Sequence, residues 1–379
     1  MSYLGEDVPK LGFGLMRLPR VDGDANKPID IEQTKEMVDL FLSSGFYYFD
    51  TAYGYPGSEA AIKEALVERH PRESYLLATK LPAWAGAKTA EEARQMFYTS
   101  LERTGAEYFD YYLLHNIDRN RVESFDKFQI WDFAQELKEK GLVKHVGFSF
   151  HDHPSVLEDV LGKHPEMEFV QLQINYADWD DPVVEARGNL EVAVNHDKPV
   201  IIMEPLRGGK LCNLPPAAEK TFKKAAPDKS MASWGLRFAM ALPNVITVLS
   251  GMSTIEQMRN NIDIASTDYT AGFSDKEKQA LSKVQKILAD IPRIPCTDCR
   301  YCTKDCPQNI LIPAIFDAYN HYLVYEDLDG AKHSFAFATG QTGVGKASDC
   351  EECGQCEGVC PQSIEIIAKL KEIAAKLED

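Results

Sequence analysis

The sequence predicts an α/β protein, a (β/α)8 TIM barrel followed by a smaller, mainly α-helical domain. Short β-rich runs alternate with amphipathic helical stretches from about Leu11 to Ser266. The alternation occurs eight times over roughly 250 residues, which fits the order and length of a TIM barrel. After Ala265 the pattern changes, and eight of the nine cysteines lie between Cys296 and Cys360.

Composition narrows the class of protein. The 379 residues are 44% hydrophobic and 26% charged, as in a globular protein rather than a disordered or fibrous one. The net charge of −17 argues against nucleic acid or an anionic membrane as partner, since both require a basic surface. The chain has no apolar run of the roughly 18 residues that span a bilayer. Its start, MSYLGEDVPK, lacks the features of a secretory signal, so we expect a cytoplasmic location.

The expected strands are short apolar runs. They cover residues 11–16, 46–52, 75–80, 108–114, 145–150, 169–175, 200–204 and 245–251. Between them the apolar residues follow helical spacing, as Met37 and Phe41 do. Ser58 is expected to open one helix, while Gly45 and Gly141 close two others.

A doubly wound α/β sheet is the alternative fold. That fold usually has fewer strand–helix repeats and a G-x-G-x-x-G phosphate-binding motif after an early strand. Here Gly12-Phe13-Gly14 is only a fragment of the motif, because the third glycine is missing. The barrel is therefore favoured.

The domain boundary is expected near residue 280. Residues 274–290 have the pattern of one amphipathic helix, and Pro292 and Pro295 then interrupt the chain. This predicts a barrel over residues 1–280 and a second domain over residues 281–379.

The cysteines form two copies of the pattern C-x2-C-x2-C-x3-C followed by proline. The first copy consists of Cys296, Cys299, Cys302 and Cys306, and the second of Cys350, Cys353, Cys356 and Cys360. This is the pattern of bacterial two-cluster ferredoxins, in which the fourth cysteine of each run ligates the other cluster. We therefore expect two [4Fe-4S] clusters, each with three cysteines of one run and Cys360 or Cys306 of the other. Zinc is the alternative, because Cys-x2-Cys pairs also form zinc ribbons.

The segment between the two cysteine runs is long for a compact ferredoxin. Forty-three residues separate Cys306 from Cys350, and residues 312–325 have the pattern of a helix. The domain therefore resembles the helical ferredoxins that serve as electron-transfer appendages of larger oxidoreductases.

Four polar residues lie at the ends of early strands. Asp50 and Tyr55 follow the second strand, Lys80 ends the third and His115 ends the fourth. In a TIM barrel these ends face one pocket. Reduction of a carbonyl by hydride needs a proton donor, and a tyrosine next to a lysine is suited to this role. Asp50 would hold Lys80, His115 would orient the carbonyl oxygen, and Tyr53 is the alternative donor.

At these residues the chain resembles the aldo-keto reductase family, in the branch with a fused ferredoxin-type domain. The resemblance is carried by LGFGLMR from Leu11, by FDTAYGY ending at Tyr55, and by Lys80 and His115 at family-like spacing. It implies that Tyr55 donates the proton and that Asp50, Lys80 and His115 complete a catalytic tetrad. It also implies a nicotinamide cofactor, NADP(H) or NAD(H), and a small carbonyl or polyol substrate.

The same resemblance suggests nucleotide contacts. Ser149 and Gln173 would contact the nicotinamide carboxamide, and the pyrophosphate loop would contain Pro205, Leu206, Arg207, Gly208 and Gly209. The adenosine end would involve Gly251, Met252, Ser253, Gln257 and Asn261. The departures from the family pattern are Phe150 in place of an asparagine, Met203 in place of an aromatic residue, Glu204 in place of a small polar one and Gly251 in place of a lysine. Arg207 or Lys210 would have to pair with the Glu204 carboxylate near a pyrophosphate.

The remaining candidates lie outside the tetrad and the nucleotide contacts. Trp84 either lines the substrate pocket or belongs to the core. Asp152 is expected to cap a helix, with a substrate wall or a metal site at His151 and His153 as alternatives. Cys212 is expected to be a small buried hydrophobic residue.

The favoured function is therefore an NAD(P)(H)-dependent carbonyl reductase with an iron–sulfur module. One alternative is a redox-sensing or partner-binding nicotinamide protein with little turnover. Another is electron transfer between a ferredoxin, or another redox protein, and a bound flavin, for which the sequence offers no support.

Overall fold

The computed structural model describes residues 3–5, 7–24, 27–181, 184–266, 272–325 and 327–378. The chain forms two compact units. One consists of Met1–Leu206 with Ala232–Gly272, and the other of Arg207–Met231 with Phe273–Asp379. Among the described residues, no helix combines the length and apolar character needed to cross a membrane.

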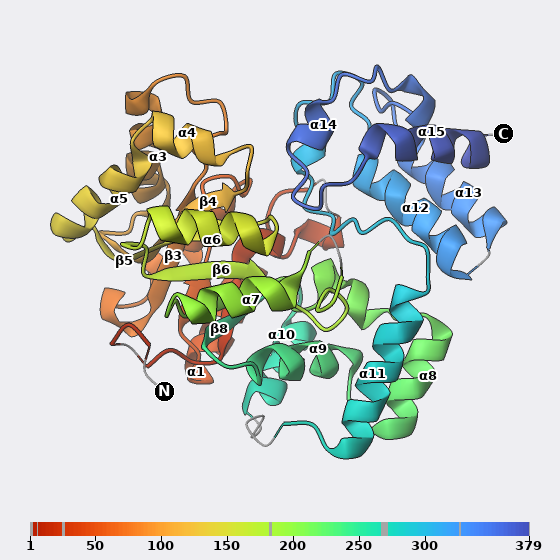
Figure 1. Cartoon of the computed structure of the whole chain (residues 1–379), viewed down its shortest axis with the longest axis horizontal. Coiled ribbons are helices and arrows are strands. Elements are labelled where there is room, and N and C mark those ends of the chain that lie inside the picture. The colour runs from red at the N-terminus through yellow and green to blue at the C-terminus, as the bar shows by residue number, and fades with distance from the viewer. Residues whose placement is uncertain are drawn as a thin grey trace. The chain divides into compact units, whose positions relative to one another are not determined.

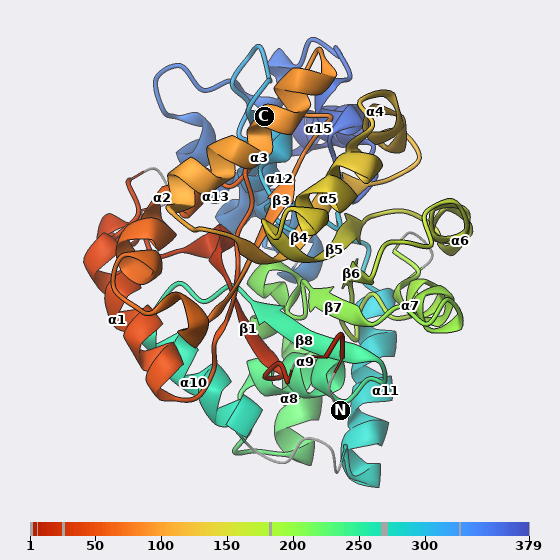
Figure 2. The ribbon, with the colours of Figure 1, turned by 90° about the vertical axis from the view of Figure 1, so that its left-hand side faces the viewer.

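The first unit contains a closed, all-parallel barrel of eight strands in sequence order (Figure 2). The strands are β1 Leu11–Gly14, β2 Tyr48–Asp50, β3 Leu76–Leu81, β4 Phe109–Ile117, β5 Val143–Phe150, β6 Phe169–Gln173, β7 Val200–Met203 and β8 Val245–Ser250. Each coincides with a strand expected from the sequence, to within a few residues at either end. The predicted (β/α)8 fold is confirmed.

Helices follow the strands around the barrel. They are α1 Ile31–Ser43, α2 Ser58–Ile62, α3 Ala90–Thr104, α4 Val122–Lys127, α5 Ile130–Glu139, α6 Pro154–Lys163, α7 Ala186–Asn195, α9 Met231–Met240 and α10 Ile255–Ser266. Helix α2 continues as a π-helix over Lys63–Val67, which the sequence did not predict. Gly45 and Gly141 follow the ends of α1 and α5 in the left-handed conformation, as predicted.

Alternation along the strands separates two cores. Outward side chains such as Phe49 and Leu77 pack with the surrounding helices. Inward side chains such as Tyr48, Ala78 and Tyr111 form a smaller core inside the barrel. The next inward position on each strand, toward its carboxyl end, is therefore available for polar groups.

Strand β4 contains an irregularity at its carboxyl end. Leu114 pairs with Phe148 on β5, but the next pair is Ile117 with Phe150, so β4 has one residue more than β5 in this interval. This is a β-bulge, and bulges commonly redirect side chains next to active sites.

The second unit is helical. It contains α8 Pro216–Ala225, α11 Asp275–Ala289, α12 Ile312–Tyr325, α13 Leu328–Thr339, α14 Gln355–Gly358 and α15 Ile366–Leu377. Helix α8 packs against α11, while α12, α13 and α15 pack together around a separate core (Figure 1). Helix α12 has the bounds predicted from the sequence. Helix α11 begins at a capping box of Ser274 and Glu277. The second unit also includes the segment 207–231, which the sequence did not associate with the cysteine region.

Candidate active site and cluster-binding cavities

Asp50 and Lys80 form a buried ion pair at the carboxyl ends of β2 and β3. The Lys80 ammonium also donates to the backbone carbonyl of Thr51 at 2.7 Å, and Gln171 on β6 donates to the second Asp50 oxygen at 3.2 Å. Burial lowers the pKa of Lys80, an effect that the Asp50 carboxylate opposes. The barrel interior thus holds an ammonium group in a fixed position.

Tyr55 lies next to that ammonium group. Lys80 Nζ is 3.4 Å from Tyr55 Oη. The loop that carries Tyr55 is held by a 2.7 Å hydrogen bond between the hydroxyls of Thr51 and Ser58 and by the 3.0 Å bond that Ser58 donates to Leu15 O. The alternative donor, Tyr53, instead has its ring under the Arg103 guanidinium at 4.5 Å.

His115 completes the group. Its ring is 5.8 Å from the Tyr55 ring, centroid to centroid, in an edge-on arrangement. Burial places the pKa of His115 well below its ordinary value, and the charges of Lys80, His151 and Arg121 act in the same direction. His115 is therefore neutral near pH 7 and can donate a hydrogen bond without carrying charge. The structure brings all four residues of the predicted tetrad together.

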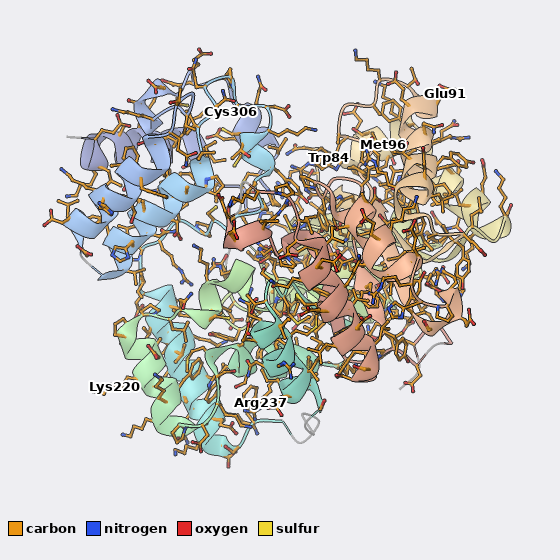
Figure 3. All side chains as sticks on the ribbon, turned by 180° about the vertical axis from the view of Figure 1, so that it is seen from behind. Trp84, Glu91, Met96, Lys220, Arg237 and Cys306 are labelled. Atoms are coloured by element: carbon orange, nitrogen blue, oxygen red, sulfur yellow. The ribbon has the colours of Figure 1, made fainter. Side chains whose placement is uncertain are left out.

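A second layer of side chains surrounds His115. Trp84, labelled in Figure 3, donates from its indole nitrogen to His115 O at 2.8 Å. The Arg121 guanidinium lies 4.7 Å from the centroid of the Trp84 ring and pairs with Asp118 at 2.7 Å. Burial, with Arg121, lowers the pKa of His151 to about 3. Trp84 therefore lies beside the tetrad and also packs against the barrel's helix-facing core.

Asp152 and His153 have structural partners. Asp152 pairs with Arg119 and accepts from the His153 backbone N–H at 2.7 Å, while His153 pairs with Glu185. Helix α6 has His153 as its N-cap, without a side-chain cap. The expectation that Asp152 caps this helix is wrong, because its carboxylate forms a salt bridge with Arg119.

Cys212 is partly buried, and burial raises its pKa.

The proposed carboxamide contacts lie at the ends of β5 and β6. Ser149 Oγ accepts from the backbone N–H of Asn116 at 2.7 Å. Gln173 donates to Asp178 at 2.9 Å, and Asn175 donates to the same oxygen at 2.6 Å. Both Ser149 and Gln173 are buried in the barrel mouth. Phe150 is buried in the helix-facing core instead.

The Glu204 carboxylate pairs with a cation that the sequence did not indicate. Arg17 Nη2 lies 3.7 Å from Glu204 Oε1. Lys210, suggested as its partner, pairs instead with Asp317 on α12. Arg17 follows β1 and Glu204 follows β7, so no local pattern relates them.

The remaining nucleotide candidates lie in loops. Pro205 and Leu206 approach α9, where a Cβ on Gly235 would be 2.7 Å from Pro205 O. Arg207, Gly208 and Gly209 all have positive φ angles.

At the end of β8, Ser253 donates to Arg17 O at 2.7 Å and its N–H donates to the Gln257 side chain at 2.8 Å. Asn261 donates to Ser250 at 2.8 Å. A Cβ on Gly251 would be 3.5 Å from Arg17 Cβ.

Sequence reasoning missed two residues of this site. Gln171 is an inward position of β6, and its alternation with Val170 and Leu172 could have revealed it. Asn116 has a completely buried side chain whose amide atoms have no hydrogen-bond partner among the described residues. Its position depends on the bulge in β4, for which the sequence carries no pattern.

The eight cysteines of the two runs line two cavities. One cavity, of about 310 Å³ with its open mouth included, is lined by Cys296, Cys299, Cys302 and Cys360. The other, of about 350 Å³, is lined by Cys306, Cys350, Cys353 and Cys356. Figure 3 labels Cys306, which lies in the loop before α12. Each cavity thus receives three cysteines from one run and one from the other.

The surroundings of the thiols fit an iron–sulfur cluster. Ile312, at the start of α12, lines both cavities, and the rest of each wall combines apolar side chains with a few polar or charged ones. Burial raises the pKa of Cys296 and of Cys356 to about 11. Such thiols ionise when a cation is bound, and cluster iron would provide it.

Known proteins match both parts of the chain. Residues 10–281 match the aldo/keto reductase family, and residues 295–365 match the 4Fe-4S dicluster domain. An uncharacterized oxidoreductase of Bacillus subtilis, YqkF, is 26% identical over 293 residues, covering 69% of this chain and 88% of that protein. An aldo-keto reductase of Mycolicibacterium vanbaalenii is 28% identical over 266 residues, covering 70% and 85%.

Solved structures agree in fold. The holo form of an aldo-keto reductase from Bacillus halodurans, AKR11C1, superposes with a TM-score of 0.57 at 22% identity, covering 74% of this chain and 93% of that one. An aldo-keto reductase from Klebsiella pneumoniae in complex with NADPH gives a TM-score of 0.56 at 21% identity, covering 73% and 91%. The chain belongs to the aldo/keto reductase family and carries a C-terminal 4Fe-4S dicluster domain.

Proposed function

We propose that this oxidoreductase reduces a small carbonyl compound, or oxidises the corresponding alcohol, with Tyr55 as the proton donor. The observation that supports this is the 3.4 Å distance between Lys80 Nζ and Tyr55 Oη. Because Lys80 is held by Asp50 and by Thr51 O, its charge stays next to the phenol. An adjacent cation stabilises the charge that a phenol develops as it gives up its proton.

The remaining residues of the tetrad position the reacting groups. His115 is neutral, so it orients the carbonyl oxygen by a hydrogen bond and leaves proton donation to Tyr55. Asp50 fixes Lys80, and Gln171 in turn fixes Asp50. A nicotinamide, as NADP(H) or NAD(H), supplies or accepts the hydride when it is bound.

The nucleotide contacts belong to the same proposal. Ser149 and Gln173 would hold the nicotinamide end, and Arg207 with its neighbouring glycines would hold the pyrophosphate. Ser253, Gln257 and Asn261 would lie at the adenosine end. Arg17 adds a cation on this side of the barrel and is already paired with Glu204.

We assign one [4Fe-4S] cluster to each cysteine cavity, with Cys360 and Cys306 as the exchanged ligands. Because hydride transfer moves two electrons together, we place the clusters outside the carbonyl step and assign them one-electron exchange with a ferredoxin or another redox protein. The proposal includes a cytoplasmic location, a reductase barrel over residues 1–280 and a ferredoxin-type domain over residues 281–379.

Replacement of the proton donor tests the central assignment. In Tyr55→Phe, we expect kcat/KM for aldehyde and ketone reduction to fall by about 10²- to 10⁴-fold. The affinity for NADPH should stay within a few-fold, because the nucleotide contacts are retained. Steady-state kinetics on a carbonyl panel and nucleotide titration measure the two quantities.

Tyr53→Phe is the matched control. It removes a hydroxyl from the same loop, but the Tyr53 ring stacks with Arg103 rather than facing Lys80. Its activity should stay within a few-fold of the unsubstituted protein. Unchanged activity in Tyr55→Phe would refute the assigned donor, and a large loss in Tyr53→Phe would transfer the role to that residue.

A further inference from the structure

Both side-chain polar atoms of Asn116 are buried without a hydrogen-bond partner among the described residues. These atoms are Nδ2 and Oδ1 of a fully buried side chain. A buried amide left without hydrogen bonds is costly, so such a group normally has a partner in the working protein. The residue directly follows His115, at the carboxyl end of β4.

The bulge in β4 determines which side of the strand Asn116 occupies. Leu114 and Ile117 both belong to the helix-facing core, although regular alternation would place residues 114 and 117 on opposite faces. The extra residue between them accounts for the difference, and His115 and Asn116 together lie opposite Ser149. The positive φ angle of Asn116, 62°, is one that asparagine tolerates.

The backbone of Asn116 is tied to Ser149, one of the proposed carboxamide contacts. Its N–H donates to Ser149 Oγ at 2.7 Å. The residue after Ser149 is Phe150, which has no side-chain amide. Its ring is buried in the helix-facing core, where it packs against Phe148. Strand β4 thus carries a side-chain amide on the residue whose backbone N–H contacts Ser149.

We propose that the Asn116 side chain pairs with the carboxamide of the bound nicotinamide. An asparagine amide presents one N–H2 donor and one C=O acceptor, and the carboxamide presents the complementary pair. The two amides can make reciprocal hydrogen bonds, which would fix the face of the nicotinamide ring presented to the substrate. This inference rests on the proposed nicotinamide-dependent function and assigns a positioning residue within it.

A nucleotide analogue isolates this contact. The acetylpyridine analogue of NADP⁺ replaces the carboxamide N–H2 by a methyl group and so removes one of the two hydrogen bonds. The unsubstituted holoprotein should bind the analogue about three- to tenfold more weakly than NADP⁺. In Asn116→Gly, which keeps the positive φ angle without strain, the preference for NADP⁺ over the analogue should shrink several-fold, to what Ser149 and Gln173 supply. Anaerobic isothermal titration calorimetry measures both constants.

Two further variants complete the experiment. Asn189→Ala removes another buried asparagine, whose amide donates to Asp152 O and Val184 O, and should keep the original preference for NADP⁺. Asn116→Asp keeps the size of the side chain but loses the amide donor, and should also bind NADP⁺ more weakly. If Asn116→Gly retains the full preference, the assignment of Asn116 is wrong even though nucleotide binding stands. If the unsubstituted protein binds neither NADP⁺ nor NAD⁺, the proposed function itself fails.

Discussion

Lys80 contacts both the Asp50 carboxylate and the Tyr55 hydroxyl. It is buried, pairs with Asp50 and donates to Thr51 O, and Tyr55 lies within 3.4 Å. The same residue therefore contributes to catalysis and to the stability of the barrel interior. The two contributions can be measured separately. The contribution to stability depends on the ion pair with Asp50, whereas catalysis also requires the Lys80 ammonium next to Tyr55.

The Lys80→Met variant leaves the Asp50 carboxylate buried without its cation. We expect the free energy of unfolding of the barrel to fall by about 3–5 kcal/mol. The double variant Lys80→Met with Asp50→Asn removes both charges and should recover most of that loss, while carbonyl reduction stays abolished. Urea unfolding followed by tryptophan fluorescence measures stability. Equal stability of the single and double variants would contradict a buried ion pair.

The low pKa of His115 gives a prediction for the pH dependence. Because that pKa lies well below 6.5, lowering the pH from 8 to 6 does not protonate the ring. His115→Gln should lower kcat/KM by roughly 10- to 100-fold and leave the shape of the pH profile over this range unchanged. The profile of both proteins is measured with one substrate at saturating nucleotide. Loss of an ionisation near pH 6.5 in the variant would show that His115 titrates in the working range.

At the residue scale the sequence predicted that Asp50, Tyr55, Lys80 and His115 lie together, which the structure shows, and it missed the residues that hold them. Asp50, Lys80 and His115 each lie at or near the carboxyl end of a recognisable strand, so the barrel geometry brings them together once the strands are assigned. Asn116 could not be found in this way, because its direction depends on one extra residue in β4. The pair of Arg17 with Glu204 joins β1 and β7, and no spacing in the chain encodes it.

At the element scale, strand β5 has the least space for an added atom. A Cβ on Gly147 would be 2.3 Å from Phe169 O and 2.8 Å from the Phe169 ring. Backbone oxygen cannot move aside without disturbing the pairing of β5 with β6. Gly147→Ala should therefore destabilise the barrel by about 1–3 kcal/mol, measured by thermal or urea unfolding.

Gly162→Ala is the matched control for this prediction. Gly162 lies in α6, and its added Cβ would have no neighbour within 4 Å. Alanine is the better helix former by up to about 1 kcal/mol, so this variant should be neutral or stabilising. Similar unfolding curves for the two variants would contradict the tight approach of β5 and β6.

The regular elements were predictable because each has its own pattern. The eight strands and helix α12 follow from apolar runs and helical spacing. The π-helix at Lys63–Val67 and the bulge in β4 change the register by one residue, and a periodic pattern does not show such a shift. The packing of α8 on α11 joins segments about 50 residues apart, so it depends on tertiary contacts.

At the scale of the whole molecule, the arrangement of the cysteines predicts how cluster loss combines in double variants. With exchanged fourth ligands, Cys296 and Cys360 serve one cluster, whereas Cys296 and Cys306 serve different ones. Replacing the first pair by alanine should leave one cluster and about four irons per chain. Replacing the second pair should remove both clusters. Iron analysis and electron paramagnetic resonance of the reduced protein distinguish the outcomes, and the opposite result would establish unexchanged ligands.

The two cavities also have a consequence for biosynthesis. Each of them takes cysteines from both runs, so the cysteine set of one cavity is complete only after Cys356 has been synthesised and that of the other only after Cys360. Cluster insertion is therefore expected only after both cysteine runs have been synthesised, and both clusters should be acquired within the same late step. A nascent chain stalled before residue 350 would contain all eight barrel strands but would lack a complete set of cysteines for either cluster.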